Sequence, residues 1–301
     1  MSVATKGLAG RMSGMAEHQS ARVLVESPLV RVFDVICRAP RSGYGVMESN
    51  STEWSQIGLP RRGVFVVERC GEPVVVDTNT ALLLGLEDEY RVRHPTNDGD
   101  EGTVIAVAPH LLEDVLGGLG GRAASLRPGD RLAVCLVTRA LNEQDPDQLE
   151  AEEATLSLLA SLSHALSHPM SENGCRLGPA QRLRVEQTRA LLASSPETRW
   201  DLSGLGRALR CSPFHLARQF RAATGETISR YVLRLRLAVA VERLADGERN
   251  IAALALATGF SHHSHFSARF RREFGLTPSH ARDILTKSKL DELRTGVAAA
   301  N

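Results

Sequence analysis

The chain has 301 residues, which at about 100–200 residues per domain allows two domains. Hydrophobic residues make up 43% and charged residues 24%, as in average globular chains, and these values exclude wholesale disorder and collagen-like or coiled-coil composition. No apolar run approaches the roughly 18 residues that span a bilayer, and residues 1–20 lack the apolar core of a secretion signal, so we expect a cytoplasmic protein without a membrane partner. Five cysteines without a CxxC pair argue against zinc ribbons and disulfide frameworks.

The net charge of +1 conceals opposite charges in the two halves of the chain. Residues 1–175 contain 15 Lys and Arg against 24 Asp and Glu, a net charge of −9, whereas residues 176–301 contain 21 against 11, a net charge of +10. Of those 21 basic residues 19 are arginine, which suits phosphate and guanine, although GC-rich coding also enriches arginine. Because a basic surface attracts a polyanion, this pattern predicts nucleic-acid binding by the second half.

The first half of the chain predicts strands. Residues 1–20 have no periodicity, and we expect a disordered tail there. After them come short β-branched runs separated by turns, at 29–37, 63–68, 74–77, 80–84, 90–93 and 103–107. Strands at this spacing are typical of an antiparallel barrel or sandwich, which often holds a small-molecule site. We therefore assign residues 21–147 to a β-rich sensor domain.

After Pro109 the spacing of apolar residues becomes helical, with candidate helices at 110–116, 148–168 and 179–193. The polar segment 167–178 contains Pro169 and two glycines and is the predicted hinge between the halves. We assign residues 148–198 to a helical linker. The candidate helix at 148–168 carries a stripe of four leucines, Leu156, Leu159, Leu162 and Leu166. This stripe can bury against its own domain or against a second subunit. We favour a homodimer through this stripe, because paired half-sites raise affinity for DNA.

The sequence predicts neither a metal site nor a cofactor. The first half has no His-x-His pair, and His94, followed by proline, is expected to shape a loop. Cys37 and Cys70 lie in or beside predicted strands, where a small buried hydrophobic role is usual and a redox switch is the alternative. His262 and His265 are three residues apart, but no cysteine or carboxylate is suitably placed to complete a zinc site with them.

Residues 200–282 contain an internal duplication. A shift of 50 residues superimposes Phe220 on Phe270 and Gly225 on Gly275. Each unit predicts a short helix, a tight turn and a second helix, the arrangement of a helix-turn-helix. N-caps are expected at Asp201, Ser212, Asn250, Ser261 and Thr277. Five motif residues mark the turns, the helix ends and the start of the last helix: Gly225, Gly259, Phe260, Gly275 and Pro278.

Between the two units, residues 229–245 are apolar over most of the helix circumference, which predicts a helix buried on several sides between them. Residues 199–286 are therefore expected to form a double helix-turn-helix DNA-binding domain, followed by a tail at 287–301. The predicted fold class is α+β: an N-terminal antiparallel β-barrel, a helical linker and a C-terminal all-α domain.

Helical phase selects the DNA-contacting face. Leu216 and Phe220 define the buried stripe of the first recognition helix, and Phe266 and Phe270 that of the second. The candidates for base reading are Phe214, Ala217, Arg218, His263, Ser264, His265 and Ala268. The candidates for phosphate contact, which positions the protein without reading sequence, are Ser212, Arg221, Ser261, Arg271 and Arg272.

The segments SPFHLARQFRAATG (212–225), YVLRLRLAVAVERLADG (231–247) and IAALALATGFSHHSHFSARFRREFGLTPSHAR (251–282) resemble the AraC/XylS family of bacterial transcription regulators. The resemblance implies two helix-turn-helix units joined by one helix, with recognition helices that start near Ser212 and His262. It also implies a cupin-like sensor domain, which the first half of the chain matches only weakly.

The resemblance implies a sequence-specific transcription regulator, with a double-stranded DNA operator, a small-molecule effector and RNA polymerase as partners. One alternative is an alkyltransferase-type enzyme fused to a DNA-binding module. That chemistry needs a zinc-bound cysteine cluster and a reactive Pro-Cys-His, neither of which occurs here, so we do not expect an enzyme. A nucleoid-type binder without sequence preference is the other alternative.

Overall fold

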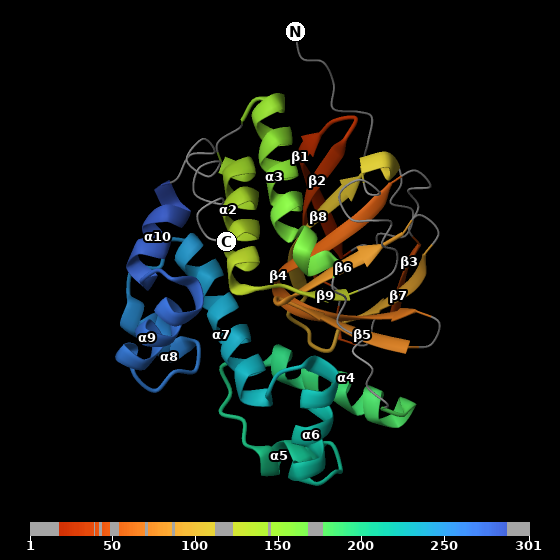
Figure 1. Ribbon diagram of the computed structural model, residues 1–301, viewed down its shortest axis with the longest axis vertical. Coiled ribbons are helices and arrows are strands. Elements are labelled where there is room, and N and C mark those ends of the chain that lie inside the picture. Colours follow the sequence, from red (N-terminus) through yellow and green to blue (C-terminus); the bar gives the residue numbers. More distant parts are fainter. Residues whose placement is uncertain are drawn as a thin grey trace.

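The computed structural model describes residues 18–38, 40–41, 44–48, 54–69, 72–85, 88–111, 123–143, 146–167 and 177–287. Antiparallel strands make up the first part of the chain, and helices make up the second (Figure 1). The predicted α+β class is therefore confirmed. No helix within these described ranges is both long and apolar enough to cross a membrane.

The strands form one sheet in which every pairing is antiparallel, with the path β1-β2-β8-β4-β6-β9. The strands are β1 (Gln19–Glu26), β2 (Val30–Cys37), β3 (Tyr44–Glu48), β4 (Ser55–Arg69), β5 (Glu72–Asp77), β6 (Thr80–Leu84), β7 (Glu89–Arg93), β8 (Asp100–Val107) and β9 (Ala123–Ser125). The long strand β4 joins two parts of the sheet. Its residues 55–63 pair with β8, and its residues 64–69 pair with β5.

The helices are α2 (Pro128–Glu143), α3 (Gln148–Leu166), α4 (Pro179–Ser194), α5 (Leu202–Ala208), α6 (Pro213–Thr224), α7 (Ile228–Ala245), α8 (Ile251–Ala257), α9 (His263–Phe274) and α10 (Pro278–Lys287). Two helix pairs, α5–α6 and α8–α9, lie along α7 (Figure 1). Asp201, Ser212 and Asn250 cap helices as predicted. The predicted cap at Ser261 is wrong, because His262 is the N-cap of α9 and its side chain makes no capping hydrogen bond.

Two predictions for the first half need correction. Strand β1 begins at Gln19, inside the predicted tail. Helix α2 was not predicted, because its run AVCLVT is short, apolar and rich in β-branched residues, and periodicity alone cannot separate such a run from a strand. The predicted helix at 110–116 is described only as far as residue 111, where it is helical, and residues 168–176 of the predicted hinge lie outside the described ranges.

The leucine stripe of α3 is buried within its own chain. Leu159 and Leu162 are 1% and 0% exposed, and Leu166 is also fully buried. The helix packs on α2 and on strands β1, β2 and β9. The prediction that this stripe forms a dimer interface is therefore wrong, since its side chains already belong to the hydrophobic core.

One continuous hydrophobic core joins the two halves. It contains Ile57 and Ile105 of the sheet, Val134 of α2, Val241 of α7 and Phe266 of α9. Helix α7 is therefore buried not only between the helix pairs, as predicted, but also against α2, beside which it lies in Figure 1. As a result, the N-terminal half contributes directly to the position of α7.

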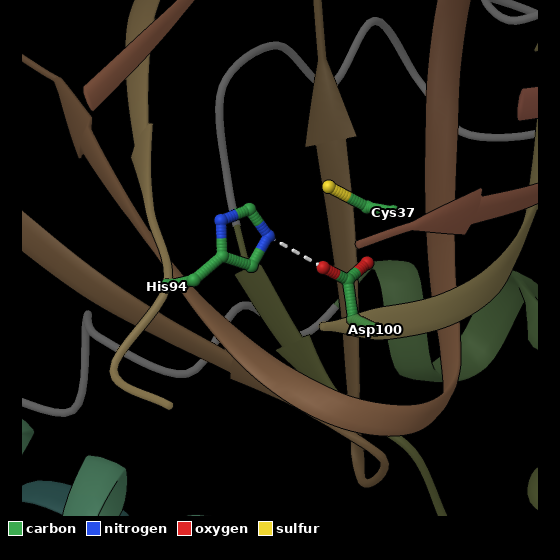
Figure 2. Close-up of side chains that lie close together, drawn as sticks. All are labelled: Cys37, His94 and Asp100. Carbon is green, nitrogen blue, oxygen red and sulfur yellow. Dashed lines mark hydrogen bonds and ion pairs between the residues drawn. The ribbon is translucent and has the colours of Figure 1, made fainter. Parts of the chain in front are cut away.

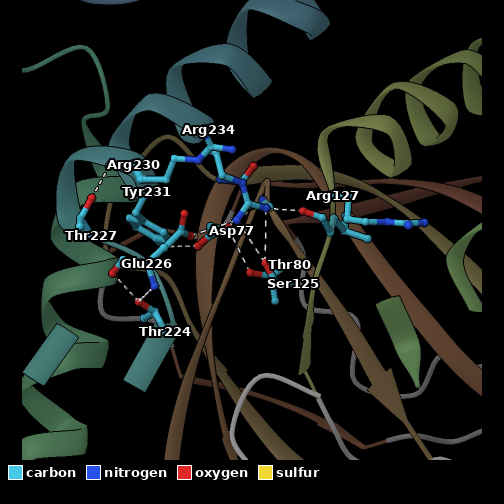
Figure 3. A network of polar contacts seen from close by, with 12 residues as sticks. Asp77, Thr80, Ser125, Arg127, Thr224, Glu226, Thr227, Arg230, Tyr231 and Arg234 are labelled. Atoms are coloured by element: carbon cyan, nitrogen blue, oxygen red, sulfur yellow. Dashed lines mark hydrogen bonds and ion pairs between the residues drawn. The ribbon is translucent and has the colours of Figure 1, made fainter. Parts of the chain in front are cut away.

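A buried polar network also joins α7 to the sheet (Figure 3). The hydroxyl of Tyr231 in α7 donates a hydrogen bond to Asp77 of β5. Arg189 of α4, which is 2% exposed, lies 3.5 Å from the same carboxylate and donates to Thr80 Oγ1 at 3.2 Å. Burial and the charge of Asp77 raise the pKa of Tyr231 well above its usual value, so this phenol remains a donor. The network ties α4, α7 and the sheet together.

Candidate nucleic-acid interface

Capping and turn residues define the two helix pairs. The N-cap Ser212 accepts a hydrogen bond from the His215 amide at 3.2 Å, and proline occupies the first helical position after it. Gly225 and Gly275 end α6 and α9 in the left-handed conformation, with φ of 76° and 73°. Gly259 turns the chain between α8 and α9 with φ of 85°. Except for the cap of α9, these positions agree with the sequence analysis.

Helix α6 presents most of the predicted face to solvent, although the candidate Ala217 is half-buried. Leu216 and Phe220 are 0% exposed and pack in the core. Phe214 is 71% exposed, an unusual position for a phenylalanine, and Arg218 and Arg221 are also exposed. A large apolar ring between exposed guanidinium groups can contact a thymine methyl while its neighbours contact guanine or phosphate.

Helix α9 repeats this arrangement. Phe266 and Phe270 are 0% exposed. The exposed candidates are Ser261, His263, Ser264, His265, Ala268, Arg271 and Arg272. Two of the imidazoles are already engaged on the helix: Arg269 Nε donates to His265 Nε2 at 3.2 Å, and His263 Nε2 lies 3.3 Å from Ser267 Oγ. These interactions orient both rings at the start of the helix.

A basic groove of about 590 Å³ runs between the two helix pairs and across α7. It brings three predicted residues, Ser261, His265 and Arg272, next to the start of α5. The groove is also lined by arginines that the sequence analysis did not select: Arg199, Arg230, Arg236 and Arg269. Asp201 is the one acidic residue in its described lining, so the groove suits an anion.

Two of these additional arginines have structural partners. Arg236 donates to the carbonyl oxygens of Pro196, Thr198 and Gly259 at 2.7–2.9 Å and so fixes the turn before α9. Arg230 pairs through both terminal nitrogens with Glu273. The other two additional arginines have no carboxylate or carbonyl partner in the described part of the chain: Arg199 donates to Ser261 Oγ at 3.4 Å, and Arg269 donates to His265 Nε2 at 3.2 Å. The sequence alone does not indicate these additional arginines, because single arginines outside the duplicated positions follow no periodic pattern.

A second candidate site lies inside the sheet. It is a cavity of about 90 Å³ with a mostly apolar lining that includes Phe65, Leu82, Tyr90 and Val92. His94 and Asp100 supply polar groups in its wall. The small volume fits an ion, a few waters or a small molecule, and it is below the roughly 300–1,000 Å³ of typical drug-sized ligand sites.

The C-terminal region matches a known domain family. Residues 205–284 match the model of a helix-turn-helix domain. The HTH-type transcriptional activator RhaR of Salmonella dublin is 35% identical over 97 residues, covering 32% of this chain and 34% of RhaR. The uncharacterized HTH-type transcriptional regulator YidL of Escherichia coli K12 is 32% identical over 99 residues, covering 33% of each protein. The chain thus spans about one third of the length of these relatives.

Solved structures give weaker likenesses. ToxT from Vibrio cholerae O395 is 14% identical, with a TM-score of 0.34, over 86% of this chain and 98% of ToxT. A transcriptional regulator with an AraC-type DNA-binding domain from Chromobacterium violaceum is 26% identical, with a TM-score of 0.34, over 36% of this chain and 98% of that one. At such TM-scores the superpositions add nothing to the sequence match.

Proposed function

We propose that the protein is a sequence-specific DNA-binding transcription regulator of the AraC type, because residues 205–284 match a helix-turn-helix domain family. The observation that supports this most is that α6 and α9 have the same arrangement: the candidate DNA-contacting side chains are exposed, and a fully buried pair lies on the opposite face. The buried pair is Leu216 and Phe220 in α6 and Phe266 and Phe270 in α9.

In the proposed complex, α6 and α9 enter successive major grooves on one side of the duplex. Arg218 forks onto guanine O6 and N7, Phe214 packs on a thymine methyl, and Ser264 hydrogen-bonds a base edge. Arg221, Arg271 and Arg272 contact phosphates. Arg199 and Arg269 in the basic groove add phosphate contacts between the two helix pairs.

The N-terminal half, with the domain boundaries given above, is proposed to be the effector domain. Its cavity offers a place for a small effector, and its packing on α7 gives a physical route from that cavity to both helix pairs. An effector shifts DNA binding only if it binds differently to two arrangements of the protein. A homodimer on paired half-sites and a contact with RNA polymerase complete the proposal.

Selection of bound DNA from a random pool by the full chain tests this function. We expect one enriched motif, and retention of that site against unrelated DNA with a preference of roughly 10³-fold or more. Two copies of the motif at fixed spacing would support a dimer. A pool that remains random, with unrelated DNA competing equally, would contradict the proposal and favour a nucleoid-type binder.

A further inference from the structure

Three side chains with metal-ligand chemistry converge inside the sheet (Figure 2). Cys37 ends β2, His94 follows β7, and Asp100 begins β8. His94 Nε2 lies 2.6 Å from Asp100 Oδ1, and the sulfur, nitrogen and oxygen ligand atoms all lie within 4.8 Å of one another. Cys37 is 3% exposed, and the His94 and Asp100 side chains are 5% and 13% exposed. This is a buried cluster of three different donor types.

Strand register explains why the cluster forms. Cys37 and Asp100 are directly paired across β2 and β8. The turn that leads from His94 back into β8 contains Gly99 with φ of 70°, and a Cβ there would lie 2.0 Å from the Cys37 carbonyl oxygen. Only glycine permits so close an approach. The backbone therefore holds the turn that carries His94 against the end of β2.

The donor set suits a zinc site. Zinc binds thiolate sulfur at about 2.3 Å, imidazole nitrogen at about 2.0–2.1 Å and carboxylate oxygen at about 2.0–2.2 Å, so two ligand atoms of one tetrahedral ion lie about 3.4–3.6 Å apart. Here the three ligand atoms lie within 4.8 Å of one another, and His94 Nε2 and Asp100 Oδ1 lie 2.6 Å apart in a hydrogen bond. An ion bound by all three would replace this hydrogen bond, move the His94 and Asp100 atoms apart by about 0.8 Å and draw the Cys37 sulfur toward them. A thiolate and a carboxylate together supply two negative charges, which balance a divalent cation inside a low-dielectric interior.

The small cavity beside the cluster provides room for a fourth ligand. His94 and Asp100 form part of its wall. Its volume of about 90 Å³ accommodates about three waters at roughly 30 Å³ each. The His94 Nδ1 atom is buried and has no hydrogen-bond partner among the described residues, and it lies on the side of the ring away from Asp100 (Figure 2). A water or small molecule in this region would satisfy it.

We propose that Cys37, His94 and Asp100 bind one divalent transition-metal ion of the zinc type, with an open coordination position that faces the cavity. Three protein ligands plus one exchangeable ligand is the pattern of a zinc site that can bind a further small molecule. The site goes beyond the proposed DNA-binding function and does not depend on it, because metal binding is measured without DNA.

Cobalt titration of the full chain, after removal of metal with a chelator, tests the site. Co²⁺ reports thiolate ligation through a charge-transfer band in the near ultraviolet, which the surface histidines of α9 cannot produce. We expect one equivalent of Co²⁺ with this band, and competition by Zn²⁺. Cys37→Ser should abolish the band, whereas the matched control Cys211→Ser, at a half-buried cysteine outside the sheet, should retain it.

Asp100→Asn provides a second test if Cys37→Ser does not fold, as judged by circular dichroism. It should weaken Co²⁺ binding by more than the 10–100-fold that loss of an outer-shell partner costs. Absence of the band from the original chain, its persistence in Cys37→Ser, or unchanged affinity in Asp100→Asn would each overturn the proposal. The DNA selection is a separate measurement, so failure of the metal site and failure of the DNA-binding function are distinguishable.

Discussion

Glu242 of α7 forms a buried ion pair with Arg131 of α2, so a charge of the C-terminal half is neutralised by the N-terminal half. The two side chains are 4% and 2% exposed. Arg131 also donates to the carbonyl oxygens of Pro60 and Arg61 at 2.8 and 2.9 Å. Among the described residues, neither side chain has an ion-pair partner inside its own half, so this pair makes the packing of α7 on α2 specific as well as apolar.

Breaking this pair should be costly. Glu242→Gln leaves Arg131 buried without its counter-charge, and we expect the free energy of unfolding to fall by about 3–5 kcal/mol, measured by equilibrium denaturation in urea. Adding Arg131→Met should restore part of the loss, with a coupling energy of about 0.5–3 kcal/mol. Asp246→Asn is the matched control: its ion pair with Arg62 is exposed, and its loss should cost no more than about 1 kcal/mol. If the two buried substitutions lower the free energy of unfolding additively, Glu242 and Arg131 do not stabilise each other, which would contradict the ion pair.

Gly259 and Gly275 provide a comparison of backbone strain with and without a clash. Both have positive φ, and alanine at either should cost about 1–2 kcal/mol for the left-handed conformation. A Cβ at Gly259 would also lie 2.5 Å from the Glu197 carbonyl oxygen, whereas a Cβ at Gly275 meets no atom within 4 Å. Overpacking adds about 1–3 kcal/mol, so Gly259→Ala should be clearly more destabilising in thermal or denaturant unfolding. Equal losses would show that the turn before α9 adjusts freely.

Local features were predictable from the sequence, and long-range ones were not. Caps such as Ser212 and the buried phase of α6 and α9 depend on residues three or four positions apart, so spacing alone reveals them. The cluster of Cys37, His94 and Asp100 depends on the register between β2 and β8, which joins positions more than 60 residues apart. The continuous core across α7 depends on α2, whose β-branched run does not by itself predict a helix.

Arg218 should determine one position of the operator. Arg218→Ala should lower affinity and relax base preference at one position by about 1–3 kcal/mol, measured by binding to a set of single-base operator variants. Arg218→Lys is the matched control, because it retains the charge but loses the planar fork. It should keep the salt dependence of binding and still lose much of the base preference. An unchanged preference in both variants would remove Arg218 from the base-reading face.

Arg271 and Arg272 should contribute to affinity without contributing to specificity. Both lie exposed in the last turn of α9, where binding to phosphate positions the helix. Each alanine substitution should weaken binding to all sequences and flatten the slope of log affinity against log salt concentration by about 0.9 for each phosphate that the variant no longer neutralises. Arg182→Ala is the control, because this exposed arginine of α4 pairs with Glu72 of the sheet and should leave the slope unchanged. If the α9 variants keep the original slope as well, their guanidinium groups do not bind phosphate, and the orientation of α9 in the groove must differ from the one proposed.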